Sequence, residues 1–436
     1  MSSHFNRSAP LILALAVGAG VMFFLRQKPA STAPLPPPAN GSLAPPSPAL
    51  SVLAEMPDWS SLDAYQNSIT RRDFERLLTT VFVTGGAWRN YMEIDESEAR
   101  IRTGDDPAAE IFRLRFAPDG LAESPPRHWR KTSELPPAPA GKPLDGLRIA
   151  IDPGHIGGEW AKVEERWLQV NGGTPICEGD MTLLVARLLR PKLEALGAKV
   201  SLVRDSGEPI TPLRPESLVT LAKESQGQAD SPEALLKFAE RLFYRTAEIR
   251  ARAKRVNETL KPDLVLCLHF NADPWGDPTN PTLVERTHLH LLLNGAYTDE
   301  EVSLADQRFA LLEKLLSRTH EEEAQVGATV ADVFAQASGL PPFLYPPGAA
   351  NALPVNGHPY LWARNLLANR LYDCPVIFME PYVMNSTIDH PRLQAGDYEG
   401  LREIDGRLLP SIFREYADAL TRGLANHYST HRATAP

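Results

Sequence analysis

The stretch Leu147-Arg-Ile-Ala-Ile-Asp-Pro-Gly-His155 decides how this chain should fold. Its aliphatic and β-branched side chains predict a buried strand, and Pro153-Gly154 ends that strand, so that His155 falls on the loop just beyond it. In an open α/β sheet, ligands bind at the carboxyl ends of the strands. His155 is therefore a candidate metal ligand, but a single histidine does not define a site and needs partners.

Two later strands end in the same way. Leu264-Val-Leu-Cys-Leu268 is apolar enough to be a central parallel strand, and His269 follows it directly. Val376-Ile-Phe-Met379 predicts a third strand, which leads into Glu380. The carboxyl ends of parallel strands lie at one edge of a sheet, so we expect these polar side chains to gather there.

Helical segments alternate with the strands. We expect helices over about 179–196, from Ser231 to about 260, and over about 411–427, with a further strand from Lys199 to Arg204. This order predicts an α/β fold, in which helices flank a mostly parallel, twisted sheet with right-handed crossovers.

Glu178 opens the helix that follows the first strand, at the same edge as His155 and His269. Acidic residues are favoured in the first turn of any helix, so Glu178 alone would be interpreted as a helix cap. Zinc hydrolases, however, usually have three protein ligands from His, Glu or Asp and one position left open for water. The three residues together are candidates for such a site.

Four motifs in this order resemble the type-3 zinc-dependent N-acetylmuramoyl-L-alanine amidases, over residues about 147–430. They are Ile149-Ala-Ile-Asp-Pro-Gly-His-Ile-Gly-Gly158, Cys177-Glu178, Leu268-His-Phe-Asn-Ala-Asp273 and Met379-Glu-Pro-Tyr382. The helix before His269 also carries Arg250 and Asn257, where the family tends to have such residues.

The resemblance implies that His155, Glu178 and His269 bind Zn²⁺ and that Glu380 is the catalytic acid. The implied reaction is hydrolysis of the amide between N-acetylmuramic acid and L-alanine in peptidoglycan, during cell-wall remodelling or daughter-cell separation. Asp152 and Asn271 flank the implied ligands and could orient them. Two alternatives stay open: a zinc peptidase or amidohydrolase acting on another exported amide, and a non-catalytic peptidoglycan-binding protein.

Two long segments depart from the family pattern, over about 205–245 and 275–372, and they could widen, line or cover the cleft. Within the second, a helix is expected from Val302 to Glu323. His288 and His290 alternate on an apparent strand and could bind metal in principle, but a surface or groove role is favoured because they lie away from a strand-end loop. A protein regulator of the site is possible, but the sequence does not identify one.

The N-terminal part divides into four segments by composition. Residues 1–28 contain an uncharged run, Ala9 to Leu25, that fits a signal anchor or signal peptide, and flanking basic residues favour an uncleaved membrane anchor. A proline-rich linker over 29–50 follows. Residues 51–116 predict a small α+β module of unknown role, with a capping box at Thr70 that opens a helix through Phe82, and 117–146 is a second proline-rich linker.

The net charge and the cysteine content exclude two classes of protein. The formal net charge of -9 argues against nucleic acid, because phosphate binding needs clustered Lys and Arg. Cys177, Cys267 and Cys374 are too few for a disulfide scaffold, and we expect them to be small buried residues with at most one disulfide. An exported enzyme of the cell envelope or periplasm, with peptidoglycan and the membrane as partners, is the expectation.

Overall fold

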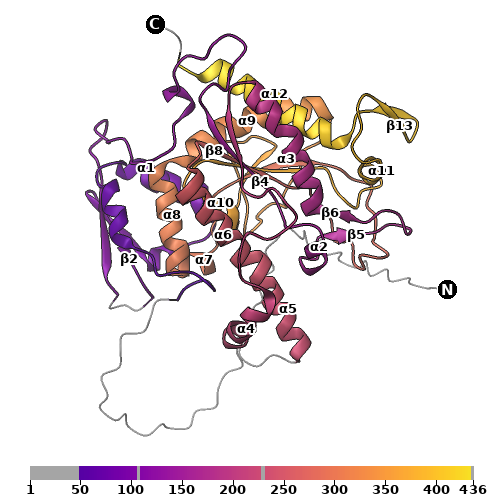
Figure 1. The fold of residues 1–436 in the computed structure, drawn as a ribbon. Helices are drawn as coiled ribbons and strands as arrows, with labels where there is room; N and C mark the ends of the chain where they lie inside the picture. The colour runs from indigo at the N-terminus through magenta and orange to yellow at the C-terminus, as the bar shows by residue number, and fades with distance from the viewer. Residues whose placement is uncertain (1–48, 106–108, 227–230, 434–436) are drawn as a thin grey trace, which may run out of the picture.

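A seven-stranded sheet in the order β10-β11-β9-β12-β8-β4-β7 forms the centre of the computed structural model, which describes residues 49–105, 109–226 and 231–433 (Figure 1). Strands β7, β4, β8 and β12 are parallel, whereas β9 runs antiparallel to β12. The predicted α/β fold with a mostly parallel sheet is confirmed. The strands are β4 (Arg148–Pro153), β7 (Lys199–Leu202), β8 (Leu264–Leu268), β9 (Leu289–Leu293), β10 (Leu353–Pro354), β11 (Leu361–Ala363) and β12 (Val376–Pro381).

Helices cover both faces of this sheet. On one face, α3 (Glu178–Ala195), α9 (Thr319–Ser338) and α12 (Ile412–His431) pack on side chains such as Ile149 and Ile151. On the other, α6 (Glu248–Lys254) with its extension η7 (Arg255–Leu260), and α10 (Leu367–Leu371), pack around Ala150. The alternation follows from the strand geometry, which points successive side chains to opposite faces.

The helix predicted from Val302 to Glu323 is wrong in its extent. The chain instead forms α7 (Asp299–Ser303), α8 (Ala305–Ser317) and α9, with a break at Arg318. Arg318 adopts the left-handed conformation, at φ 62° and ψ 30°, and its guanidinium binds Glu321 in the first turn of α9. The helical pattern continues across this residue without a glycine or proline, so the sequence carries no stop signal there.

The N-terminal module consists of helical turns and a three-stranded antiparallel sheet. Thr70 caps the first helix by accepting a hydrogen bond from the Asp73 amide, and the helical run ends at Phe82 as predicted. Its apolar side chains share one core with Leu311 and Leu315 of α8. The elements are η1 (Trp59–Tyr65), α1 (Arg71–Leu77), η2 (Leu78–Phe82), η3 (Ala87–Asn90), β1 (Met92–Ile94), β2 (Glu98–Arg102) and β3 (Ile111–Arg115).

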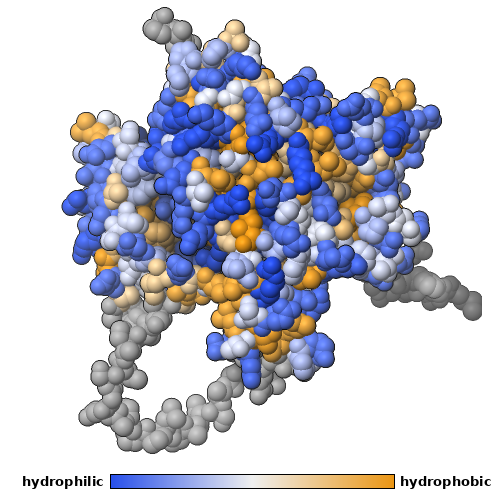
Figure 2. Space-filling model, in the orientation of Figure 1, coloured by the Kyte–Doolittle hydropathy of each residue, from blue (hydrophilic) through white to orange (hydrophobic). Residues whose placement is uncertain are grey.

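A helical lobe projects from the body below the sheet in Figure 1. It contains η5 (Pro215–Leu218), α4 (Val219–Gln226), α5 (Pro232–Leu242) and η6 (Phe243–Ala247), and Figure 2 shows apolar residues on its surface. The remaining elements are η4 (Thr132–Glu134), α2 (Trp160–Val163), β5 (Trp167–Leu168), β6 (Ile176–Cys177), α11 (His390–Gln394), β13 (Arg402–Ile404) and β14 (Arg407–Leu409).

The expected membrane segment, Ala9 to Leu25, and most of the first linker lie outside the described residues. Among the residues that the structure does describe, no helix is both long and apolar enough to span a bilayer. Membrane anchoring therefore stays a prediction from the sequence.

Asp263 ties the proline-rich segment 117–146 to the start of the sheet. Its carboxylate accepts hydrogen bonds from the Arg130 and Arg148 guanidinium groups, at 2.6 and 2.7 Å, and from the Arg148 backbone amide. Trp129, beside Arg130, is 1% exposed. These contacts fix the beginnings of β4 and β8, the two strands that deliver His155 and His269.

We expect Asp263→Asn to destabilise the fold in a pH-dependent way. Burial opposes ionisation of Asp263, but Arg130 and Arg148 outweigh it and lower its pKa to about 2. The ordinary pKa of an Asp side chain, as in the unfolded chain, is about 4. Above that pH the ion pairs of Asp263 contribute their full stabilisation, and this contribution is lost as the pH falls from about 4 to 2. The variant should lose about 1 to 2 kcal/mol at pH 7, since solvent screens the two partly exposed arginines.

Urea unfolding at pH 7 and at low pH measures this difference. Asp119→Asn, at an exposed position, is the control and should change little. A deficit for Asp263→Asn that stays constant down to pH 2 would contradict the ion-pair explanation.

Candidate functional site

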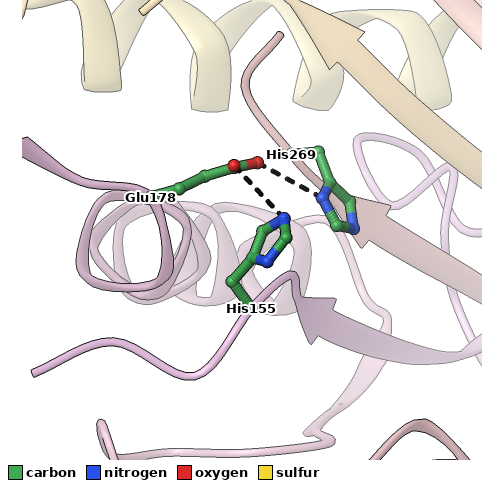
Figure 3. Close-up of side chains that lie close together, drawn as sticks. All are labelled: His155, Glu178 and His269. Atoms are coloured by element: carbon green, nitrogen blue, oxygen red, sulfur yellow. Dashed lines mark ion pairs between the residues drawn. The ribbon is translucent and has the colours of Figure 1, made fainter. Parts of the chain in front are cut away.

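His155, Glu178 and His269 converge at the carboxyl ends of β4 and β8 (Figure 3). The His155 Nε2 atom lies 3.2 Å from one Glu178 oxygen, and the His269 Nδ1 atom lies 3.3 Å from the other. Each residue offers one possible ligand atom, and these three atoms lie within 4.8 Å of one another. The structure thus brings together the three residues that the sequence selected.

These spacings fit a tetrahedral divalent cation. With metal–ligand distances of about 2.0 to 2.2 Å, neighbouring tetrahedral ligands lie about 3.3 to 3.5 Å apart. The two contacts of Glu178 are close to that separation, and two imidazoles with one carboxylate form a donor set typical of zinc hydrolases. The arrangement is therefore compatible with one metal ion shared by the three side chains.

Glu178 faces the histidines rather than only capping its helix. Its side chain is 2% exposed, and one carboxylate oxygen also accepts a hydrogen bond from the Phe270 backbone amide. Burial opposes ionisation of Glu178, but the two imidazoles outweigh it and hold its pKa well below the usual range. The carboxylate is therefore charged, as a metal ligand must be.

The two histidines differ in their electrostatics. Burial lowers the pKa of His155, but Glu178 and Glu164 outweigh it and raise the pKa to about 9. Burial also lowers the pKa of His269, and in that case Glu178 offsets it only in part. Of the two imidazoles, His155 is therefore the one whose surroundings favour the protonated form.

Glu164 is a site residue that the sequence analysis missed. It follows the short helix α2, and its carboxylate lies 3.7 Å from Nδ1 of His155, on the side of the ring away from Glu178. Its other oxygen accepts a hydrogen bond from the Ile156 amide. Glu164 thereby leaves Nε2 of His155 directed at Glu178, which is how carboxylates commonly orient a metal-binding imidazole.

Two buried arginines hold the backbone of the His155 loop. Arg252 donates hydrogen bonds to the carbonyl oxygens of Pro153 and His155, and Arg204 donates to those of Pro153 and Gly154. Arg204 was predicted only as the end of a strand. Neither role has a local sequence signal, because each arginine comes from a different element.

Asp152 acts on the loop through Arg252. It accepts hydrogen bonds from Arg252 and from the Tyr372 hydroxyl, and no hydrogen bond to His155 or His269 is present among the described residues. Asn271 instead bonds His290, at 3.3 Å from Nδ1. Any orienting effect of these two residues on the three candidate ligands is therefore indirect.

The expectation of a surface or groove role for His288 and His290 is wrong. They are 5% and 4% exposed, because Phe343 and Tyr345 cover them. His290 pairs with Glu380 across β9 and β12. They do not belong to the cluster that could hold a metal in the described chain.

Glu380 lies at the end of β12 and lines the same cavity, of about 190 Å³, as the three candidate ligands. Burial, and then the negative charge of Glu178, raises its pKa to about 8. Both inserted segments contribute to the cavity wall, through Arg245 in one and Leu292 in the other. The expectation that they could line the cleft is thus confirmed.

The remaining residues named from the sequence, Arg250, Asn257 and the three cysteines, lie outside the cluster of candidate ligands. Arg250 lies 3.8 Å from Asp306, and Asn257 donates to the carbonyl oxygen of Leu371. All three cysteines are free; Cys267 and Cys374 are buried as expected, whereas Cys177 is half-buried.

Comparisons with known proteins were made on the sequence and on the structure. No family model matches the chain, and no curated protein matches it. Solved structures that resemble it include the N-acetylmuramyl-L-alanine amidase Ami1 from Mycobacterium smegmatis, with 17% identity and a TM-score of 0.35, over 66% of this chain and 99% of that one. Likenesses of this strength assign no function.

Two other solved structures are similar at the same level. The N-acetylmuramoyl-L-alanine amidase from Clostridium difficile 630 has 13% identity and a TM-score of 0.33, over 66% of this chain and 97% of that one. The amidase AmiC2 of Nostoc punctiforme has 16% identity and a TM-score of 0.29, over 65% and 99%. The function has to be argued from the residues of the site.

We expect Gly154→Ala to weaken metal binding at this site. A Cβ at position 154 would overlap the His269 imidazole, so that ring has to shift from its present position. Because one of three donors is displaced, the affinity for Zn²⁺ or Co²⁺ should fall at least about tenfold in titration calorimetry.

Gly158→Ala is the matched control in the same loop. Its added Cβ meets no heavy atom within 4 Å, and its φ of +54° costs only backbone strain. Equal metal affinities for Gly154→Ala and the unsubstituted protein would show that His269 is not a ligand.

Proposed function

We propose that this protein is a zinc-dependent N-acetylmuramoyl-L-alanine amidase, which hydrolyses the amide between the lactyl group of N-acetylmuramic acid and L-alanine in peptidoglycan. The observation that supports this most is the convergence of His155, Glu178 and His269 beside a further, half-buried carboxylate, Glu380. The order of the four motifs that carry these residues supports the same substrate.

His155, Glu178 and His269 would hold the ion. A Zn²⁺ bound there supplies Lewis acidity, which polarises the amide carbonyl and lowers the pKa of a water molecule. The three side chains would supply three donors, and zinc hydrolases keep a further position for water or substrate. Arg204 and Arg252 keep the His155 loop in place, so the donor atoms need little rearrangement.

Glu380 is the proposed general acid–base. It lines the same cavity as the trio, and the positive charge of a bound divalent ion would favour the carboxylate form that a base requires. Glu380 accepts the proton of the attacking water as the new carbon–oxygen bond forms, and it returns that proton to the nitrogen of L-alanine as the amide bond breaks. The products are a free lactyl carboxylate and a stem peptide with a free amino end.

The protein is proposed to act outside the cytoplasmic membrane, where peptidoglycan lies. The uncharged run Ala9 to Leu25 and the proline-rich tract after it are the sequence features that support an anchored, exported enzyme. Residues 51–116 are proposed to stabilise the larger unit, because their core is shared with α8.

The proposal predicts a metal-dependent release of stem peptides. Full-length protein should release peptides with free L-alanine amino ends from purified peptidoglycan, as identified by mass spectrometry. Chelation should abolish the release and added Zn²⁺ should restore it. Products cut within the stem, with the lactyl amide intact, would instead identify a peptidase.

Glu380→Gln tests the proton-transfer role. The variant keeps the shape of the side chain but cannot accept a proton, so kcat should fall by about 10² to 10⁴ while zinc content is unchanged. Glu403→Gln, at an exposed position on β13, is the control with normal activity. Undiminished turnover in Glu380→Gln would exclude this mechanism.

A further inference from the structure

A second cavity, of about 530 Å³, opens beside the cavity that holds the candidate ligands. The two cavities share wall residues, namely Glu164, Arg166, Arg245 and Ala272. Because they have these walls in common, the second cavity extends the first away from His269. A substrate whose scissile amide lies beside the trio could therefore continue into it.

Trp167 and Trp275 give the second cavity an apolar wall. Trp167 lies on the β5–β6 hairpin, beside α2 in Figure 1, and Trp275 lies on the loop after β8. The Gln169 amide donates to the Pro278 carbonyl at 2.7 Å and thus joins the hairpin to the loop, while the Thr282 amide donates to the Trp275 carbonyl at 2.8 Å. The wall is therefore held by backbone hydrogen bonds.

The acidic residues of this cavity each lie near a basic side chain. Glu164 lies 3.7 Å from His155, Glu165 lies 3.9 Å from Lys237, and Asp273 binds Arg286. Arg286 thus compensates the charge of Asp273, whereas Lys237 also lies 2.7 Å from Glu240 and serves two carboxylates.

Two basic residues in the wall of the second cavity have no such carboxylate partner. Lys162 and Arg245 have no carboxylate within ion-pair distance among the described residues. The Lys162 ammonium lies 5.6 Å from the Trp167 ring centroid, so it is placed against the aromatic wall. The cavity wall thus holds one more basic residue than acidic residues, with Lys162, Arg166, Lys237 and Arg245 against Glu164, Glu165 and Asp273.

We infer that the second cavity binds the carboxylate-bearing peptide arm of the substrate, with Lys162 and Arg245 as the residues that read its negative charge. This inference rests on the proposed function and specifies which part of the substrate the site recognises. Cations pair with peptide carboxylates, and the two indole rings bury the aliphatic parts of the arm. A stem peptide with free carboxylates is then preferred over the same peptide with carboxamides.

Two pairs of soluble probes test the preference. The first pair is a free stem peptide in its carboxylate and its carboxamide form, and its binding to full-length, zinc-loaded protein is measured by calorimetry. The second pair is the corresponding muramoyl peptides, which give KM and kcat. Unsubstituted protein should bind the carboxylate form about tenfold more tightly, and its KM should show the same preference.

Lys162→Met and Arg245→Met keep an aliphatic side chain but remove the charge. Each should reduce the preference for the carboxylate form over the carboxamide form by roughly fivefold or more, and Lys162→Arg should retain that preference. Lys192→Met is the control, because Lys192 is on α3, paired with Asp418 at 2.7 Å, and lines neither cavity.

The outcomes separate this inference from the proposed function. If the protein hydrolyses the carboxylate and the carboxamide substrate with the same KM, the carboxylate site is overturned. The same holds if Lys162→Met and Arg245→Met lose affinity equally for the two forms of the peptide. Absence of hydrolysis with a retained, Lys162-dependent preference in binding supports the carboxylate site and overturns the amidase proposal.

Discussion

The buried carboxylate of Glu178, held between two imidazoles, is the interaction on which the rest of the site depends. A carboxylate that is 2% exposed costs several kcal/mol to desolvate unless cations or donors surround it. His155, His269 and the Phe270 amide meet that requirement from two different strand ends. Without these contacts, the buried charge of Glu178 would destabilise the fold. The carboxylate and its polar partners therefore have to occur together.

The polypeptide around the cluster is organised to keep those contacts in register. His155 adopts a left-handed conformation, at φ 59°, which a non-glycine residue occupies only under constraint. Arg204 and Arg252 supply that constraint by binding successive carbonyl oxygens of the loop. Gly154 is needed for a different reason, since any side chain there would collide with the His269 imidazole.

Much of this arrangement could be predicted from the sequence, because it depends on local patterns. Apolar runs that end at His155, His269 and Glu380 specify strands, and parallel strands align their carboxyl ends. Glu164 and Arg252 could not be found in this way. Their contacts join segments that are close only in the folded chain, and nothing in their immediate sequence distinguishes them from surface charges.

The same limit explains the errors. His288 and His290 alternate as an edge strand would, but Phe343, far along the chain, covers them. Arg318 interrupts a helical pattern without a glycine or proline, and its guanidinium binds Glu321, three residues further along the chain. For the two histidines a long-range contact decides the outcome against the local pattern, whereas the break at Arg318 has no signal of its own in the sequence.

The central claim is that two imidazoles and one carboxylate bind a single divalent ion. A crystal structure of the zinc-loaded protein, with anomalous data at the zinc edge, tests it most directly. The account predicts one peak, with His155 Nε2, His269 Nδ1 and a Glu178 oxygen at about 2.0 to 2.2 Å from it. Zinc bound elsewhere, or absent from this cluster at full loading, would contradict the account.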